Sequence, residues 1–183
     1  MNDEPLPTLP HYVRPGLRLV FIGFNPGIES ARLGHYYAFR RNPFWRHLSE
    51  CGLVSQPVTF LDDATLMDAE GIGLTDLCAL PTVKASELSR EQIAEGARNL
   101  EIELRAAAPA VACFSGKGAW EGFATEVLGL PRSEAATRPF GLQPERIGQT
   151  TAIWIIPNSS GLAAGLHGRR VELLRELAAQ LGH

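Results

Sequence analysis

The sequence has 183 residues, enough for one domain with a substantial core, and its 45% hydrophobic and 20% charged residues are ordinary for a globular protein. A formal net charge of -3 gives no overall sign of nucleic-acid binding, and no apolar run approaches the length of a membrane span. The three cysteines are widely spaced and too few to hold an iron–sulfur cluster. We therefore expect a reduced, intracellular (cytoplasmic) protein that uses no metal and no cofactor.

The first regular element is expected shortly after the start of the chain. Residues 1–16 carry four prolines and an acidic beginning, which predicts an irregular lead-in that is not a targeting peptide. The apolar run from Leu17 to Ile22 then predicts a buried strand, which ends abruptly in GFNPG at residues 23–27. Open α/β sheets bind ligands beyond the carboxyl ends of their strands, so Asn25 lies where a site residue is expected.

The middle of the chain alternates between helical and strand-like patterns. Asn42 as N-cap and Pro43 as the first helical residue predict a helix that ends at Gly52. The further elements expected here are a short helix over Thr59–Glu70, a strand over Gly71–Leu77, a long helix over Ser86–Ala107, a strand over Val111–Phe114 and a helix that begins near Lys117.

The last part of the chain predicts one more strand and one more helix. Residues 131–149 have the character of a loop, Thr151–Ile156 form an apolar strand, and a helix is expected from about Arg169 to Leu181. Strands that alternate with helices predict an α/β fold with a central, mostly parallel sheet and helices on both faces. We expect residues 17–183 to form one domain.

Positive charge gathers in two places despite the acidic total. Arg40 and Arg41 lie in a stretch between Glu29 and Glu50 that contains no carboxylate, and HGRR at residues 167–170 forms a second basic cluster. A solvated basic turn is the commoner explanation of any single cluster. The alternative is a surface that contacts phosphates.

Six short motifs follow one another at compatible spacing: GFNPG, GHYY, NPFW, GLTDL with a following Pro-Thr, FSGK, and PNSSGL. In this order they resemble the mismatch-specific uracil-DNA glycosylase and thymine-DNA glycosylase branch of the uracil-DNA glycosylase superfamily. The resemblance extends from Leu17 to the terminal helix. It implies that family's α/β fold and a double-stranded DNA substrate bound by a monomer.

The resemblance also implies roles for single residues. Asn25 matches the asparagine that positions the water attacking C1′ of the deoxyribose, and Tyr37 matches the aromatic residue that stacks on the extruded base. The matches to the loop that frames the base and to the wedge that enters the duplex are Gly23, Phe24 and Gly27 for the loop, and Asn158, Gly161 and Leu162 for the wedge. The simpler alternatives are a turn asparagine, a tyrosine that covers the edge of the core, and a buried leucine.

The chain departs from the family pattern in its second motif. Ser159 stands where relatives often carry proline, and residues 163–164 are alanines where a serine and an arginine usually follow the wedge leucine. Arg169 or Arg170 would then substitute as the DNA contact.

Two further residues extend the predicted site. Asp76 in GLTDL stands at a strand end where relatives vary, and we hypothesise that its carboxylate shares or takes over water activation. A helix cap or a solvated charge is an equally acceptable explanation of Asp76. Lys117 in FSGK is expected to contact a backbone phosphate near the start of a helix.

These residues predict a monofunctional DNA glycosylase that flips uracil, and related damaged or mismatched pyrimidines, out of double-stranded DNA and hydrolyses the N-glycosidic bond. No lysine lies convincingly in the crevice to form a Schiff base. Two alternatives remain open: a hydrolase of small nucleotides or phosphate esters, and a binder of damaged DNA without catalytic activity.

Overall fold

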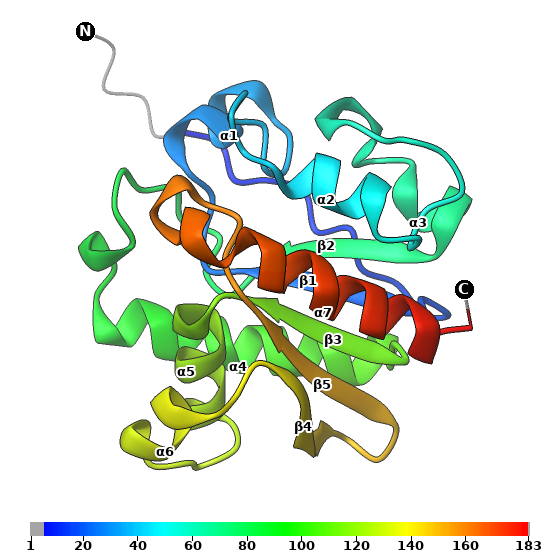
Figure 1. The fold of residues 1–183 in the computed structure, drawn as a ribbon. Helices are drawn as coiled ribbons and strands as arrows, with labels where there is room; N and C mark the ends of the chain where they lie inside the picture. Colours follow the sequence, from blue (N-terminus) through cyan, green and yellow to red (C-terminus); the bar gives the residue numbers. More distant parts are fainter. Residues whose placement is uncertain (1–5, 183) are drawn as a thin grey trace, which may run out of the picture.

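The computed structural model describes residues 6–182, and a five-stranded sheet runs through their centre (Figure 1). The strands are β1 (Leu19–Gly23), β2 (Ile72–Asp76), β3 (Val111–Ser115), β4 (Gly141–Ile147) and β5 (Thr151–Ile156), in the spatial order β2-β1-β3-β5-β4. All neighbours pair in parallel except β4, which runs antiparallel to β5 at one edge. This arrangement confirms the predicted α/β fold with a mostly parallel sheet.

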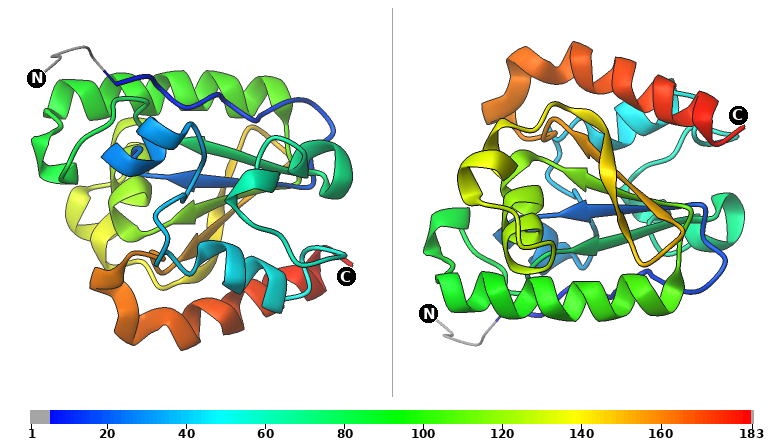
Figure 2. Two further views of the ribbon diagram at one scale, coloured as in Figure 1. Left: turned by 90° about the horizontal axis from the view of Figure 1, so that it is seen from above. Right: turned by 90° about the horizontal axis from the view of Figure 1, so that it is seen from below.

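Helices cover both faces of the sheet. The α-helices are α1 (Ile28–Leu33), α2 (Phe44–Glu50), α3 (Leu66–Glu70), α4 (Arg90–Ala107), α5 (Lys117–Glu126), α6 (Arg132–Thr137) and α7 (His167–Gln180), and the 3-10 turns are η1 (Phe60–Asp62), η2 (Ala85–Glu87) and η3 (Gly161–Leu166). Figure 2 shows the sheet between α7 on one side and α4 on the other. Among the described residues, no helix combines the length and the apolar character that crossing a bilayer requires.

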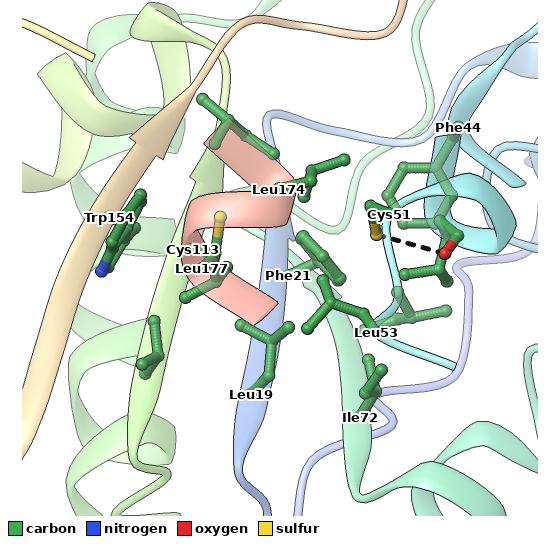
Figure 3. Packing of buried hydrophobic residues seen from close by; sticks show 14 of the residues in the cluster. Leu19, Phe21, Phe44, Cys51, Leu53, Ile72, Cys113, Trp154, Leu174 and Leu177 are labelled. Atoms are coloured by element: carbon green, nitrogen blue, oxygen red, sulfur yellow. Dashed lines mark hydrogen bonds between the residues drawn. The ribbon is translucent and has the colours of Figure 1, made fainter. Parts of the chain in front are cut away.

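Strand residues alternate between two hydrophobic cores. Phe21 and Trp154 face the core beneath α2 and α7, whereas Ile22 and Ile155 face the core beneath α4 and α5. Figure 3 shows the first core, where Leu174 and other α7 side chains pack on the strands. Side chains that point to opposite faces in turn require apolar residues at every strand position, which explains why the central strands are continuous hydrophobic runs.

Three sequence expectations need correction. Residues 131–149 are not a loop but contain α6 and β4, and the Thr59–Glu70 helix is divided into η1 and α3. The strand β4 was missed because it is an edge strand with alternate residues exposed and a proline in its middle. At α2 the N-cap is Pro43, while the Asn42 side chain accepts a hydrogen bond from the Phe44 amide at 3.0 Å.

The helix α4 packs closely against the segment after β2, and this close contact requires a glycine, Gly96, in the helix. A Cβ atom on Gly96 would lie 2.2 Å from the backbone carbonyl oxygen of Leu77. We predict that Gly96→Ala lowers the free energy of unfolding by about 2 kcal/mol, since backbone must shift to relieve the contact. Gly168→Ala in α7, where a Cβ would meet nothing within 4 Å, should leave stability unchanged or raise it. Urea denaturation of both variants measures the difference, and equal stability would contradict the prediction.

Candidate functional site

The parallel strands bring the predicted site loops to one edge of the sheet. In register, Gly23 lies opposite Asp76, Ile22 opposite Phe114, and Ser115 opposite Ile156. The four strands therefore end together, and the loops that carry Asn25 and Asn158 leave the same edge. In Figure 1 the helix α1 and the 3-10 turn η3 (orange), which follow these loops, both lie at this end of the sheet.

The amide of Asn25 is held in one orientation. Its Nδ2 donates hydrogen bonds to the Leu80 carbonyl and to the Thr82 hydroxyl oxygen, both at 2.8 Å. The Thr82 hydroxyl donates its own hydrogen to the Lys84 carbonyl at 3.0 Å, so it must accept from Asn25. Because both partners accept, the nitrogen must face them. The Oδ1 atom has no hydrogen-bond partner among the described residues and is left to accept from a bound molecule.

Asp76 and Tyr37 meet above Gly23. A Cβ on Gly23 would lie 2.1 Å from Asp76 Oδ1 and 3.2 Å from the Tyr37 hydroxyl oxygen, so both groups surround the point that a larger residue would fill. Burial raises the pKa of Asp76 to about 7, and the nearby His11 opposes this rise. The structure therefore places a carboxyl group that titrates near neutral pH beside the predicted base-stacking residue.

Tyr37 has an unusual backbone conformation. Its φ of 52° lies in the left-handed region, where residues with a Cβ are strained. Its ring stacks on Phe44 at a centroid distance of 3.9 Å and an interplanar angle of 11°. The hydroxyl is buried and has no hydrogen-bond partner among the described residues, and burial raises the pKa of Tyr37.

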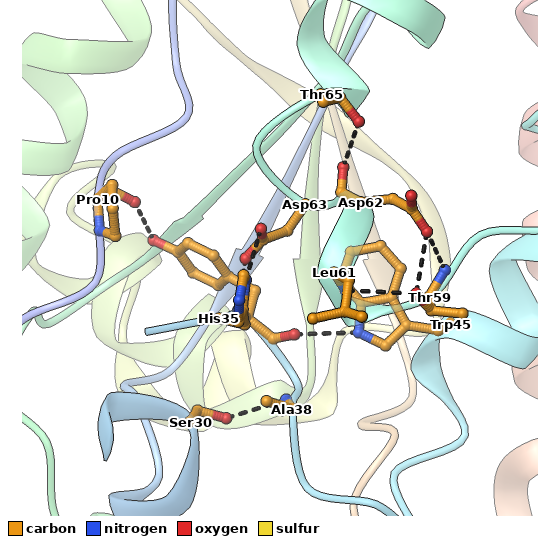
Figure 4. A network of polar contacts seen from close by, with 11 residues as sticks. Pro10, Ser30, His35, Ala38, Trp45, Thr59, Leu61, Asp62, Asp63 and Thr65 are labelled. Carbon is orange, nitrogen blue, oxygen red and sulfur yellow. Dashed lines mark hydrogen bonds and ion pairs between the residues drawn. The ribbon is translucent and has the colours of Figure 1, made fainter. Parts of the chain in front are cut away.

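Hydrogen bonds on both sides fix this strained residue (Figure 4). The buried Asp63 accepts from the Tyr36 amide and contacts His35 Nδ1, both at 2.9 Å. The neighbouring backbone is held by Trp45 Nε1, which donates to the Tyr36 carbonyl at 3.0 Å, and by the Ser30 hydroxyl oxygen, which accepts from the Ala38 amide at 3.1 Å. Such a network supplies the surrounding constraint that a strained conformation needs.

The second loop leaves β5 with a turn built by its asparagine. Asn158 is exposed, and its Oδ1 accepts from the Ser160 amide at 2.7 Å. A Cβ on Gly116 would lie 3.2 Å from Asn158 Cβ, so the loops after β3 and β5 lie against each other. Gly161 is exposed at the start of η3, while the side chain of Leu162, the predicted wedge, lies outside the described part of the structure.

The loop residues beside Asn25 point in different directions. The Phe24 side chain packs toward the core beneath α4 and α5 and lines a groove of about 850 Å³ there. Only the backbone of Phe24 is therefore positioned to frame a base next to Tyr37. Gly27 is exposed and forms an isolated parallel bridge with Thr82.

Three of the arginines predicted to contact DNA are exposed, and one of these three is paired with glutamates. Arg40 and Arg41 are exposed in the loop before α2. Arg169 is also exposed, but its Nη1 lies 3.2 Å from both Glu172 and Glu176.

Two predicted phosphate contacts require correction. Arg170 is 0% exposed, because it lies on the buried face of α7. Lys117 does not point to solvent as a free cation, because its ammonium group donates to the Ala136 and Arg138 carbonyls and lies over the Phe140 ring. Neither side chain is placed to reach a DNA phosphate.

Sequence reasoning missed several residues that position the site. Thr82 was noted only as part of a Pro-Thr dipeptide, and Asp63 lies unremarked in the stretch expected to be a short helix. The structure shows that Thr82 holds Asn25 and that Asp63 holds the loop of Tyr37. A signal for the burial of Arg170 was present, since it stands three, four and seven residues before the inward leucines of α7. Among residues 6–182, no group of three His, Cys, Asp or Glu side chains is arranged to hold a metal ion.

The raised pKa of Asp76 has a consequence for stability. The folded-state value of about 7 exceeds the usual value of 3.8, so the stabilising contribution of this group is complete below about pH 4 and is lost as pH rises through 7. We predict that Asp76→Asn is the more stable protein at pH 8, by about 2 kcal/mol, and that this advantage disappears toward pH 4. Thermal unfolding at both pH values measures it.

A control substitution separates this effect from the general loss of a carboxylate. Asp68→Asn removes a charge from a side chain that is 85% exposed. An advantage for Asp76→Asn that does not change with pH, or that Asp68→Asn reproduces, would contradict the prediction.

Comparisons with known proteins identify the family. The chain matches the family described as "Uracil DNA glycosylase superfamily" over residues 10–182. It is 35% identical over 180 residues to a G/U mismatch-specific uracil DNA glycosylase of Schizosaccharomyces pombe; the match covers 96% of this chain and 54% of that protein, so the chain spans about half the relative's length.

The fold has a counterpart among solved structures. A solution NMR structure of a proposed uracil DNA glycosylase from Methanosarcina acetivorans aligns with a TM-score of 0.65, covering 98% of this chain and 100% of that one. At 18% identity, this likeness supports the fold alone. The family match extends across the strands, the loops that carry Asn25 and Asn158, and the whole of α7, and on this basis the chain belongs to the uracil DNA glycosylase superfamily.

Proposed function

We propose that this chain is a monofunctional DNA glycosylase that excises uracil, including uracil opposite guanine, from double-stranded DNA and leaves an abasic site. The observation that carries the proposal is the Asn25 amide, whose nitrogen is held by two acceptors while its oxygen has no partner among the described residues. Family membership and the similarity to a G/U mismatch-specific uracil DNA glycosylase of Schizosaccharomyces pombe support uracil in DNA as the substrate.

The proposed reaction uses water as its only cosubstrate. Cleavage of a glycosidic bond passes through an oxocarbenium-like state, which needs a nucleophile held on one side of the sugar and stabilisation of the departing base on the other. Asn25 Oδ1 accepts a hydrogen bond from the water and orients it toward C1′. An amide cannot remove a proton, so Asn25 alone favours bases that leave readily as anions.

Asp76 supplies the missing base in this proposal. With its pKa raised to about 7, a substantial fraction of the carboxyl group is ionised at neutral pH and is basic enough to accept a proton from the attacking water. Excision should therefore become faster as pH rises through about 7. A second water-activating group would extend activity from uracil to related damaged or mismatched pyrimidines.

The extruded base would stack on Tyr37. Flipping a base out of the duplex costs a few kcal/mol, which contacts in the pocket must offset. Phe44 supports the Tyr37 ring from one side, and the clamped backbone means that the ring needs no reordering when the base arrives. Leu162 in η3 is the proposed wedge that fills the space left in the duplex.

The remaining chemistry of the proposal is simple. We propose hydrolysis without strand cleavage. Lys117 in particular is occupied by two carbonyl groups and is not placed to form a Schiff base. We also propose that the protein works inside the cell, a reducing environment in which its three free, buried cysteines stay unpaired, and that it acts on DNA as a monomer.

Incubation with a duplex that contains one uracil, followed by alkali and size separation, tests the activity directly. We predict that Asn25→Ala reduces excision by on the order of 100-fold or more, because the water loses its orienting acceptor. Asp76→Asn should lower the rate at pH 8 and remove the rise with pH, while leaving some uracil excision. The loss should be larger for bases that leave less readily.

The excision assay on these variants can also reject a role for Asp76. If Asp76→Asn left the cleavage of every tested base unchanged while Asn25→Ala abolished it, Asp76 would not take part in water activation. A wild-type protein that turned over free nucleotides but neither bound nor cleaved the duplex would reject the glycosylase proposal itself.

Phosphate contacts are proposed for Arg40 and Arg41. Each contact that is lost should reduce the slope of log affinity against log salt by about 0.9, so Arg40→Gln combined with Arg41→Gln should reduce it by about 2. Arg169→Gln is the matched control, because Arg169 is also exposed on this chain but pairs with two glutamates. A double variant with the wild-type salt slope would show that these arginines do not contact the backbone.

A further inference from the structure

The buried guanidinium group of Arg170 lowers the stability of the folded protein. The side chain is 0% exposed, and no carboxylate pairs with it among the described residues. Its Nε and Nη2 atoms are buried without hydrogen-bond partners in the described part of the chain, and burial lowers the pKa of its guanidinium group. An unpaired buried cation costs stability, so packing alone gives no reason for an arginine at this position.

The contacts that Arg170 makes all belong to the site. Its Nη1 donates to the Ser115 hydroxyl at 3.1 Å and to the Pro157 carbonyl. Ser115 is the last residue of β3, and Pro157 is the first residue of the loop that leads to η3. One guanidinium group therefore joins α7 to the ends of two strands at the edge where the site lies.

The face of the same guanidinium contacts the aromatic platform. Its Cζ lies 5.4 Å from the centroid of the Phe44 ring, a distance at which a cation and an aromatic face attract each other. Phe44 in turn stacks on Tyr37 at 3.9 Å. Arg170, Phe44 and Tyr37 thus form a continuous chain of contacts from the helix to the proposed base-stacking surface.

We propose that Arg170 is a positioning residue that sets the Tyr37 platform and the loop after β5 in a fixed relation to each other. It touches neither the base nor the DNA backbone and acts through Phe44, Ser115 and Pro157. The inference rests on the proposed function, because it assigns these two elements to base stacking and duplex entry. Lysine cannot replace it fully, since an ammonium group has no flat face and cannot reproduce the fixed fork of a guanidinium.

The test compares chemistry with DNA binding in variants of this residue. In single-turnover excision of uracil, Arg170→Met should lower the rate by on the order of 10- to 100-fold, because small displacements of a base or a catalytic group are costly. Affinity for a duplex without uracil should stay within about twofold of the wild type, because Arg170 makes no phosphate contact. Arg170→Lys should restore part of the rate.

A matched variant controls for the loss of stability. Leu177→Ala removes a side chain that is also 0% exposed on α7, about 10 Å further along the helix. All variants are assayed at a temperature where circular dichroism shows them to be folded. Leu177→Ala should then excise uracil at nearly the wild-type rate. Equal rate losses in Leu177→Ala and Arg170→Lys, or an Arg170→Lys protein with the full wild-type rate, would overturn the inference.

A second readout keeps the inference separate from the proposed function. Ring resonances of Tyr37, assigned by their disappearance in Tyr37→Phe, should shift in Arg170→Lys and remain in place in Leu177→Ala. A wild-type protein inactive on every uracil duplex would reject the glycosylase proposal, and the resonances would still test the link from Arg170 to Tyr37. Unshifted resonances in Arg170→Lys would overturn it.

Discussion

The parallel pairing of β1 with both β2 and β3 determines where the site can form. It makes the strands end together, so that chain segments far apart in sequence begin their loops at one edge. Both faces of the central strands are buried and apolar, so the register is fixed by how the side chains of each core fit together and not by a contrast between a polar and an apolar face. The site is thus a consequence of how the two cores are filled.

The site at the end of the sheet brings together three groups that each destabilise a folded protein. Asp76 is a half-buried carboxyl group with a raised pKa, Tyr37 has a strained backbone and a hydroxyl without a hydrogen-bond partner among the described residues, and Arg170 is a buried cation. Each of them costs stability, and each lies within one connected set of contacts around Gly23 and Phe44. Local costs that gather in this way are typical of functional sites, where the rest of the fold supplies the compensating stability.

Much of this arrangement could be predicted from the sequence, for physical reasons that also explain the failures. The central strands and the edge at which they end follow from continuous apolar runs followed by Gly, Pro and Asn, and the long helix α4 from its apolar stripe and its cap. Burial was harder to predict for Arg170, because charge suggested the surface while its helical position pointed inward. Edge strand β4 pairs with the next strand in the chain, but its proline and its exposed positions hid it from the pattern. The Asp63 network depends on a partner distant in sequence, which no local pattern reveals.

The hydrogen bonds to the Asn25 amide come from a surface connection, so the orientation of this amide and the packing of the core can change independently. Leu80 and Thr82, which make the two short hydrogen bonds to the Asn25 amide, belong to the connection between β2 and η2. Leu80 and Val83 in this connection are among the exposed hydrophobic side chains. Substitutions in this connection would therefore change the orientation of the Asn25 amide while the packed interior stays intact. If Asn25 has the role proposed above, the preference for leaving groups can vary through surface changes at little risk to folding.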